Sequence, residues 1–195
     1  MFFVSLVMLN TSFAQEAPFG LYWGENLSKL KSRGLSLEEL TKDGSLVFYQ
    51  TKQTPKDLSI AERYLLVIHD DYGLQKIVAS SEKITNDITG SDGKKTYEQI
   101  KRAINEKYGA PKEFFEFSGR KLYKDHDEFY QCLKYDGCGA WISYWDLGTR
   151  GAIAVQLKGV SRGVGSIVLT YEGPNWSKGL REAREAKSLK DKGAL

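Results

Sequence analysis

Short runs rich in aromatic, aliphatic and β-branched residues recur along the chain, separated by polar or glycine-containing turns. Such runs of four to six residues, with turn signals between them, are typical of strands joined as antiparallel hairpins. The clearest hairpin joins the second and third runs through Asp70–Gly73. The predicted strands are Leu46–Tyr49, Tyr64–His69, Leu74–Ala79, Phe114–Phe117, Glu128–Leu133, Ala140–Trp145, Ala152–Leu157 and Ser166–Tyr171.

Helical signals precede the first strands. Asn26 can cap a short helix that places Leu27 and Leu30 on one face, and Gly34 supplies its stop. Ser36–Glu39 fits the capping-box pattern and predicts a second helical turn.

A longer helix is predicted in the middle of the chain, after a polar loop over residues 85–95. Thr96–Gln99 is a capping box, and Gly109 with Pro111 ends the helical pattern. Apolar side chains fall at helical spacing between these limits, at Tyr97, Ile100, Ile104 and Tyr108.

The order of elements predicts an α+β fold that is mostly β, with two helix-then-antiparallel-sheet halves. The halves span residues 15–84 and 85–176, and their strands could form one continuous sheet or two packed sheets. Residues 177–195 are rich in Lys, Arg, Glu and Ala with few apolar positions. This composition predicts a frayed, solvated helix or a charged mobile tail.

Residues 1–14 resemble a signal peptide. The apolar run Phe2–Leu9 is too short to span a membrane, and Ser12-Phe13-Ala14 places small residues at the positions that precede cleavage. No Lys or Arg precedes the run, and a buried N-terminal strand is the alternative. We expect export and cleavage near Ala14, giving a periplasmic or secreted protein without stable membrane insertion.

The two cysteines, Cys132 and Cys138, are separated by five residues. In an oxidising compartment they should form a disulfide. A ring this small should contribute roughly 2 kcal/mol to the free energy of unfolding. If they face each other across a hairpin, the register places Phe129 opposite Trp141. The spacing is not Cys-x-x-Cys, so we expect a structural disulfide that fixes a loop.

Composition and motifs favour a protein that is not an enzyme and holds no cofactor or metal. The net charge is only +3 with mixed signs, which does not indicate nucleic-acid binding. A P-loop and a His-Glu-x-x-His motif are lacking, and the glycines of Gly159–Gly165 are explained better by a hairpin turn than by a phosphate-binding loop, because no helix follows them. His69 ends an apolar strand. His126 lies in a charged stretch that is better explained as a solvent-exposed loop than as a metal site.

Aromatic residues concentrate in the C-terminal half and suggest a partner-binding surface. In a strand, Trp141 and Trp145 share one face and Tyr144 takes the other. Some of these rings could therefore be exposed to a protein or glycan partner, although all of them could instead belong to the core. The candidate partner-binding residues are Trp141, Tyr144, Trp145, Arg150, Arg162 and Trp176.

Three short motifs resemble small bacterial envelope modules built from a helix and an antiparallel sheet. They are Trp23-Gly24, the Leu27/Leu30 helix with Gly34, and Ile104–Pro111 with its Lys-Tyr-Gly-Ala-Pro ending. The β-lactamase inhibitor protein and the small lipoproteins of the outer-membrane assembly machinery are examples. The resemblance implies a non-enzymatic module, of inhibitor or immunity type, that binds another envelope protein. A periplasmic small-ligand carrier and an enzyme of unrecognised type are the alternatives.

Overall fold

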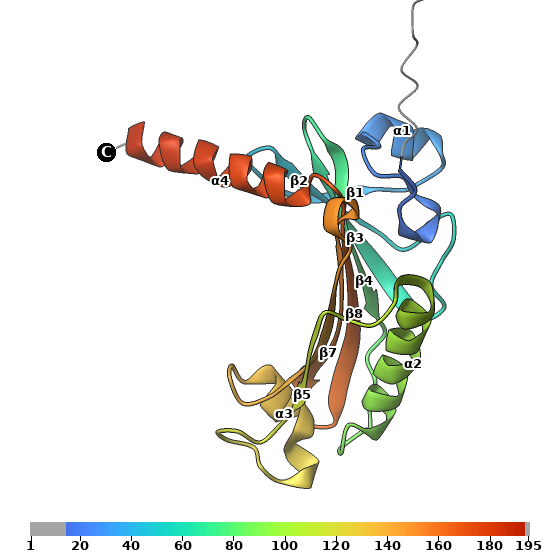
Figure 1. Ribbon diagram of the computed structural model, residues 1–195, viewed down its shortest axis with the longest axis vertical. Helices are drawn as coiled ribbons and strands as arrows, with labels where there is room; N and C mark the ends of the chain where they lie inside the picture. Colours follow the sequence, from blue (N-terminus) through green and yellow to red (C-terminus); the bar gives the residue numbers. More distant parts are fainter. Residues whose placement is uncertain (1–14, 194–195) are drawn as a thin grey trace, which may run out of the picture.

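A computed structural model describes residues 15–193; the predicted signal peptide, residues 1–14, lies outside this range. The fold is α+β, with four α-helices and one eight-stranded antiparallel sheet in the order β1-β2-β3-β4-β8-β7-β6-β5 (Figure 1). The helices are α1 (Leu27–Ser32), α2 (Ser91–Tyr108), α3 (Phe129–Lys134) and α4 (Trp176–Gly193). The strands are β1 (Glu38–Asp43), β2 (Leu46–Thr51), β3 (Ala61–His69), β4 (Gly73–Ser81), β5 (Glu113–Phe117), β6 (Ala140–Asp146), β7 (Ala152–Ser161) and β8 (Val164–Glu172).

The strand order runs inward from each edge and meets at the β4–β8 pair. Each half of the chain supplies four strands, and the two sets join between Lys76↔Glu172 and Ser80↔Val168. The predicted α+β, mostly-β class is confirmed, but the strands do not divide into two halves, because all eight share one hydrogen-bonded sheet, the continuous-sheet alternative. Two packed sheets are likewise excluded for the described strands.

One face of the sheet carries the main core. Along β7, Ile153, Val155 and Leu157 are buried, whereas the intervening Ala154 and Gln156 keep partial exposure. Helix α2 packs on β7 and β8 over this face, and α1 adds the fully buried Leu30 to the same core. Both helices lie on the same side of the sheet (Figure 1). The alternation shows that helices cover only one side of the middle strands.

Helix α4 packs on the opposite face at the other end of the sheet. Trp176 and Ala183 join Leu46 and Val67 in a second, smaller apolar cluster. The rest of α4 extends away from the body (Figure 1). No helix within residues 15–193 combines the length and apolar character needed to cross a membrane.

Two predicted elements have a different structure. The helical turn predicted at Ser36–Glu39 is wrong, because Glu38 begins strand β1 and the Glu39 carboxylate accepts a hydrogen bond from the Tyr49 hydroxyl. The strand predicted over Glu128–Leu133 is also wrong, because α3 occupies this segment. A reciprocal capping box between Asp125 and Glu128 precedes α3 and starts it as a helix.

Helix α2 begins earlier than predicted. It starts at Ser91 inside the expected loop and ends, as predicted, where Gly109 adopts a positive φ. The buried Asp87 carboxylate accepts a hydrogen bond from the Gly93 N–H, so a residue outside the helix satisfies one of its first amides.

Candidate functional site

The uncovered face of β4, β8, β7, β6 and β5 forms a continuous surface, which we call the open sheet face. Strand register aligns its side chains in rows across the sheet. All of them are partly or fully exposed, whereas on β4, β8, β7 and β6 their neighbours on the other face are buried or half-buried. One row is Val78, Thr170, Ala154, Tyr144 and Glu113, and the next is Ser80, Val168, Gln156, Ile142 and Phe115.

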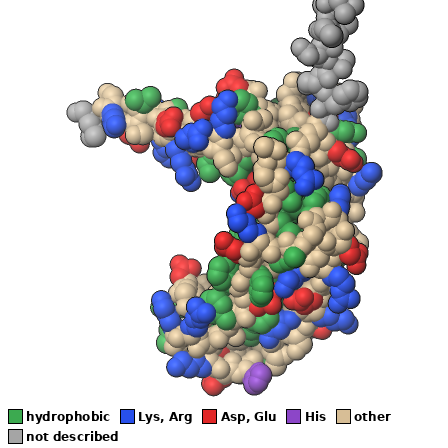
Figure 2. All heavy atoms as spheres, in the orientation of Figure 1, with side chains coloured by type: hydrophobic (Ala, Val, Ile, Leu, Met, Phe, Trp, Pro, Cys, Tyr) green, Lys and Arg blue, Asp and Glu red, His purple; other side chains and the backbone are tan. Residues whose placement is uncertain are grey.

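Side-chain size changes along these rows. Ser80, Thr170 and Ala154 are small and lie on the middle strands, whereas Tyr144 and Phe115 are large and lie towards the β5 edge. Tyr144 is 41% exposed and Phe115 is 45% exposed. Figure 2 shows the molecule hollowed between α4 and the end that carries α3, with hydrophobic side chains visible along the hollow. The open sheet face therefore offers a shallow apolar floor with aromatic side chains at one end.

Charged side chains next to this floor are paired within the protein. A third row contains Lys76 and Glu172, whose side chains form an ion pair of 2.8 Å, and Lys112 pairs with Asp146 at 2.8 Å. Lys76 also lies 4.6 Å from the centre of the Trp176 ring. Burial, followed by the Glu113 carboxylate, raises the pKa of Tyr144, which keeps its hydroxyl protonated at neutral pH. The floor thus presents apolar area, the neutral phenol of Tyr144, and the polar side chains of Ser80, Thr170 and Gln156, with Glu113 as the carboxylate at its β5 edge.

The structure separates the aromatic residues predicted to bind a partner. Trp145 and Trp176 are 2% and 8% exposed, so both are core residues, and the Trp145 indole donates to the Gly109 carbonyl. Trp141 is half-buried on the covered face, where its ring lies 5.3 Å from that of Phe129. Only Tyr144 of the four lies on the open sheet face.

The two predicted arginines lie at opposite ends of β7. Arg150 belongs to the turn before this strand, and Arg162 to the turn after it, where it pairs with Asp127. A ten-residue strand spans about 30 Å, so the two side chains do not form one rim. Sequence reasoning missed Phe115 and Ile142, although the Phe114–Phe117 run carried the signal of an aromatic strand.

The disulfide between Cys132 and Cys138 is confirmed, with Cα atoms 5.1 Å apart. Its predicted setting is wrong: Cys132 lies in α3 rather than in a strand facing Cys138. The bridge closes the turn between α3 and β6, and Cys132 Sγ accepts from the Gly119 N–H. It therefore also holds the loop that follows β5.

The histidines occupy unrelated places. His69 is buried, with Nε2 2.9 Å from Ser45 Oγ and with Nδ1 accepting from the Asp71 N–H. His126 is in a short 3-10 helix before α3. Within residues 15–193, no group of three or more His, Cys, Asp or Glu side chains is arranged to hold a metal ion.

Comparisons with protein-family models, with curated proteins and with solved structures gave no match for this chain. Its function is therefore argued from its own surface.

Proposed function

We propose that this protein is an exported, non-enzymatic binding module that docks another envelope protein on its open sheet face. The observation that carries the proposal is the alternation of burial on β4, β8, β7 and β6, which leaves one sheet face uncovered. Apolar and aromatic side chains on such a face are typical of the centre of a protein–protein interface. An inhibitor or immunity role would use the face in the same way.

The dimensions of the face suit a folded protein. Five strands spaced by about 4.8 Å and three rows spaced by roughly 7 Å give a floor on the order of 20 Å by 14 Å. Side chains around its rim extend this area towards the ~800 Å² that each partner buries in a standard interface. The internal pairing of Lys76 with Glu172 favours an apolar protein surface over nucleic acid, which would select unpaired cations.

A photoreactive amino acid placed at Tyr144 tests the proposal. In native periplasm, we expect one discrete covalent adduct with a protein, and none from the same group placed at Ile88. Ile88 is a matched control because it is 48% exposed and lies outside the open sheet face. Substituting Phe115→Ser in the same chain should greatly reduce the adduct. Equal adducts from both positions, or none from Tyr144, would contradict the proposal.

The two alternatives fit the structure less well. A carrier needs an enclosed apolar cavity, and the cavities described for residues 15–193 are open and partly polar. An enzyme would need His69 or His126 beside carboxylates in a cleft. His69 instead satisfies both ring nitrogens with Ser45 and the Asp71 amide.

A further inference from the structure

A surface cavity of about 520 Å³ lies where β1 and β2 diverge. Pairing of these strands ends at Glu38↔Gln50, and the chain then separates on both sides. Residues 33–36 after α1 form one wall, and residues 50–55 form the other. The volume falls within the range of small-molecule sites.

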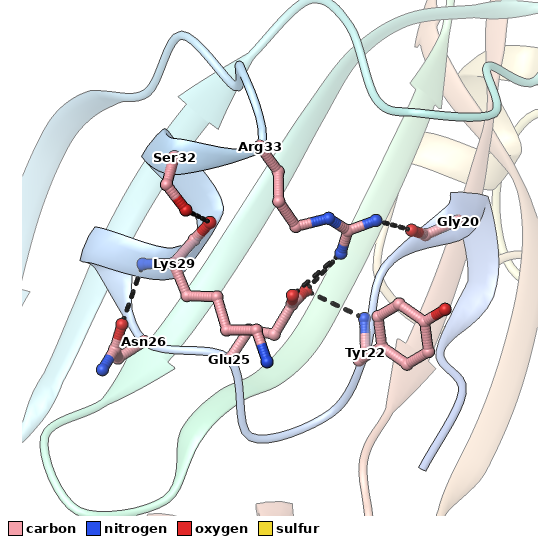
Figure 3. A network of polar contacts seen from close by, with 7 residues as sticks. All are labelled: Gly20, Tyr22, Glu25, Asn26, Lys29, Ser32 and Arg33. Carbon is pink, nitrogen blue, oxygen red and sulfur yellow. Dashed lines mark hydrogen bonds and ion pairs between the residues drawn. The ribbon is translucent and has the colours of Figure 1, made fainter. Parts of the chain in front are cut away.

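Arg33 on this wall is held in a fixed position. Its guanidinium donates to both oxygens of Glu25 at 2.8 Å and to the Gly20 carbonyl at 2.6 Å (Figure 3). The Glu25 side chain is 1% exposed, whereas that of Arg33 keeps 28% exposure. A buried carboxylate therefore fixes a guanidinium that still reaches the surface.

The fixed guanidinium has hydrogen-bonding capacity left. Arginine carries five N–H donors, and its three hydrogen bonds use at most three of them. Gly20 lies against Pro55, another residue of the cavity wall, so the bonded guanidinium is beside the cavity. Donors that are already oriented favour a planar oxyanion such as a carboxylate.

The remaining charged residues of the cavity differ in sign. Lys52 adds a second cation on the β2 side, and Glu38 supplies an acceptor where the strands separate. Both side chains are exposed and belong to no ion pair described within residues 15–193. A ligand that satisfies them carries an anionic group at one end and hydrogen-bond donors at the other.

We propose that this cavity binds a small organic acid whose carboxylate meets Arg33 and Lys52 and whose hydroxyl or ammonium groups meet Glu38. The site shares no residue with the open sheet face, so it does not depend on the proposed function. An acidic sugar and a short peptide both have this chemistry.

Amide resonance shifts of the full chain, measured by NMR during titration, test the proposal. The probes are D-glucuronate and L-alanyl-L-alanine, and the controls are D-glucose and alanyl-alanine amide, which lack the carboxylate. We expect at least one acid to shift resonances of residues 33–38 and 50–55, and neither control to do so. A response to glucuronate alone identifies a sugar acid as the ligand class, and a response to the dipeptide alone identifies a peptide.

Variants at exposed positions separate binding from folding. Lys52→Gln should weaken binding of the responding acid about tenfold, as expected for one charge-assisted hydrogen bond. Lys158→Gln, an exposed lysine on β7, is the matched control and should leave it unchanged. No shift from either acid, equal shifts from the controls, or full binding by the Lys52→Gln variant would each overturn the proposal.

Discussion

The Tyr130 hydroxyl donates a hydrogen bond of 2.7 Å to the carboxylate of Asp87 in the buried space between α3 and the start of α2. The same carboxylate accepts from the Gly93 N–H at 2.9 Å. Burial alone raises the pKa of Asp87, but hydrogen bonds from Gly93, Tyr130 and the neighbouring helix amides outweigh it and hold the pKa below its ordinary value. One anionic side chain thus joins the start of α2 to α3, the disulfide-bearing segment.

Replacing this carboxylate should change the acid stability of the protein. Because the folded pKa of Asp87 is lowered, its contribution is present above the unfolded value of about 4 and is lost as pH falls through the folded value. We expect Asp87→Asn to lower the free energy of unfolding by about 1–3 kcal/mol at pH 7. Below pH 4 this free energy should fall less steeply in the variant than in the natural protein. Urea unfolding at several pH values measures both, with the exposed Asp191→Asn as control. If the free energy of unfolding of Asp87→Asn fell below pH 4 as steeply as that of the natural protein, this assignment would be contradicted.

Removing the Arg33 side chain from its ion pair with Glu25 should strongly lower the free energy of unfolding. Arg33→Ala leaves a carboxylate that is almost fully buried without its cation, which typically costs about 3–5 kcal/mol. Chemical denaturation measures the loss, and Lys31→Ala, at an exposed position of α1 just before Arg33, should change stability by less than about 0.5 kcal/mol. A similar small effect for both variants would show that Glu25 gains solvent or another partner.

The disulfide should contribute modestly and locally. Substituting both Cys132 and Cys138 with Ser should lower the free energy of unfolding by roughly 2 kcal/mol, because the closed loop is short. A reducing agent should lower the stability of the natural protein by a similar amount and leave the double variant unaffected. Hydrogen exchange should show faster exchange near Gly119, whose amide donates to Cys132. A natural protein that is insensitive to reduction would refute this expectation.

Gly165 on β8 should not accept a side chain. A Cβ atom there would overlap the ring of Tyr130, which is fully buried against the strand. Overpacking of this kind costs about 1–3 kcal/mol, so we expect Gly165→Ala to lower the melting temperature by several degrees. Gly193→Ala, in open space at the end of α4, is the control. Combining Gly165→Ala with Tyr130→Leu should cost less than the sum of the single changes, and strict additivity would argue against the clash.

Sequence patterns located most strands because their signals are local. The Asp70–Gly73 turn and the apolar runs beside it correctly placed the β3–β4 hairpin, and Gly109 correctly ended α2. Ser36–Glu39 satisfied a capping pattern, yet this segment forms β1, which pairs with β2 across the short turn between Asp43 and Leu46, a local hairpin that was overlooked. Over Phe129–Leu133 the apolar positions fit a helix, and the Asp125–Glu128 box was the overlooked signal.

The binding surface was harder to predict because burial depends on where the helices pack. Alternation along β6 correctly placed Trp145 and Tyr144 on opposite faces, but which face is covered is decided by α2, far away in sequence. Trp176 was predicted to bind a partner, and its burial follows from packing on β2 and on Lys76. Phe115 is exposed because its side chain lies on the face of β5 that no helix covers.

The meeting of the two strand sets at β4 and β8 has a practical consequence. A break between Ser81 and Ser91 would cut no strand and no helix. The two polypeptides so produced would associate through hydrogen bonds between β4 and β8, and α4 of the second would pack on β2 of the first. The architecture is therefore suited to fragment complementation, in which neither piece folds alone and mixing restores the whole.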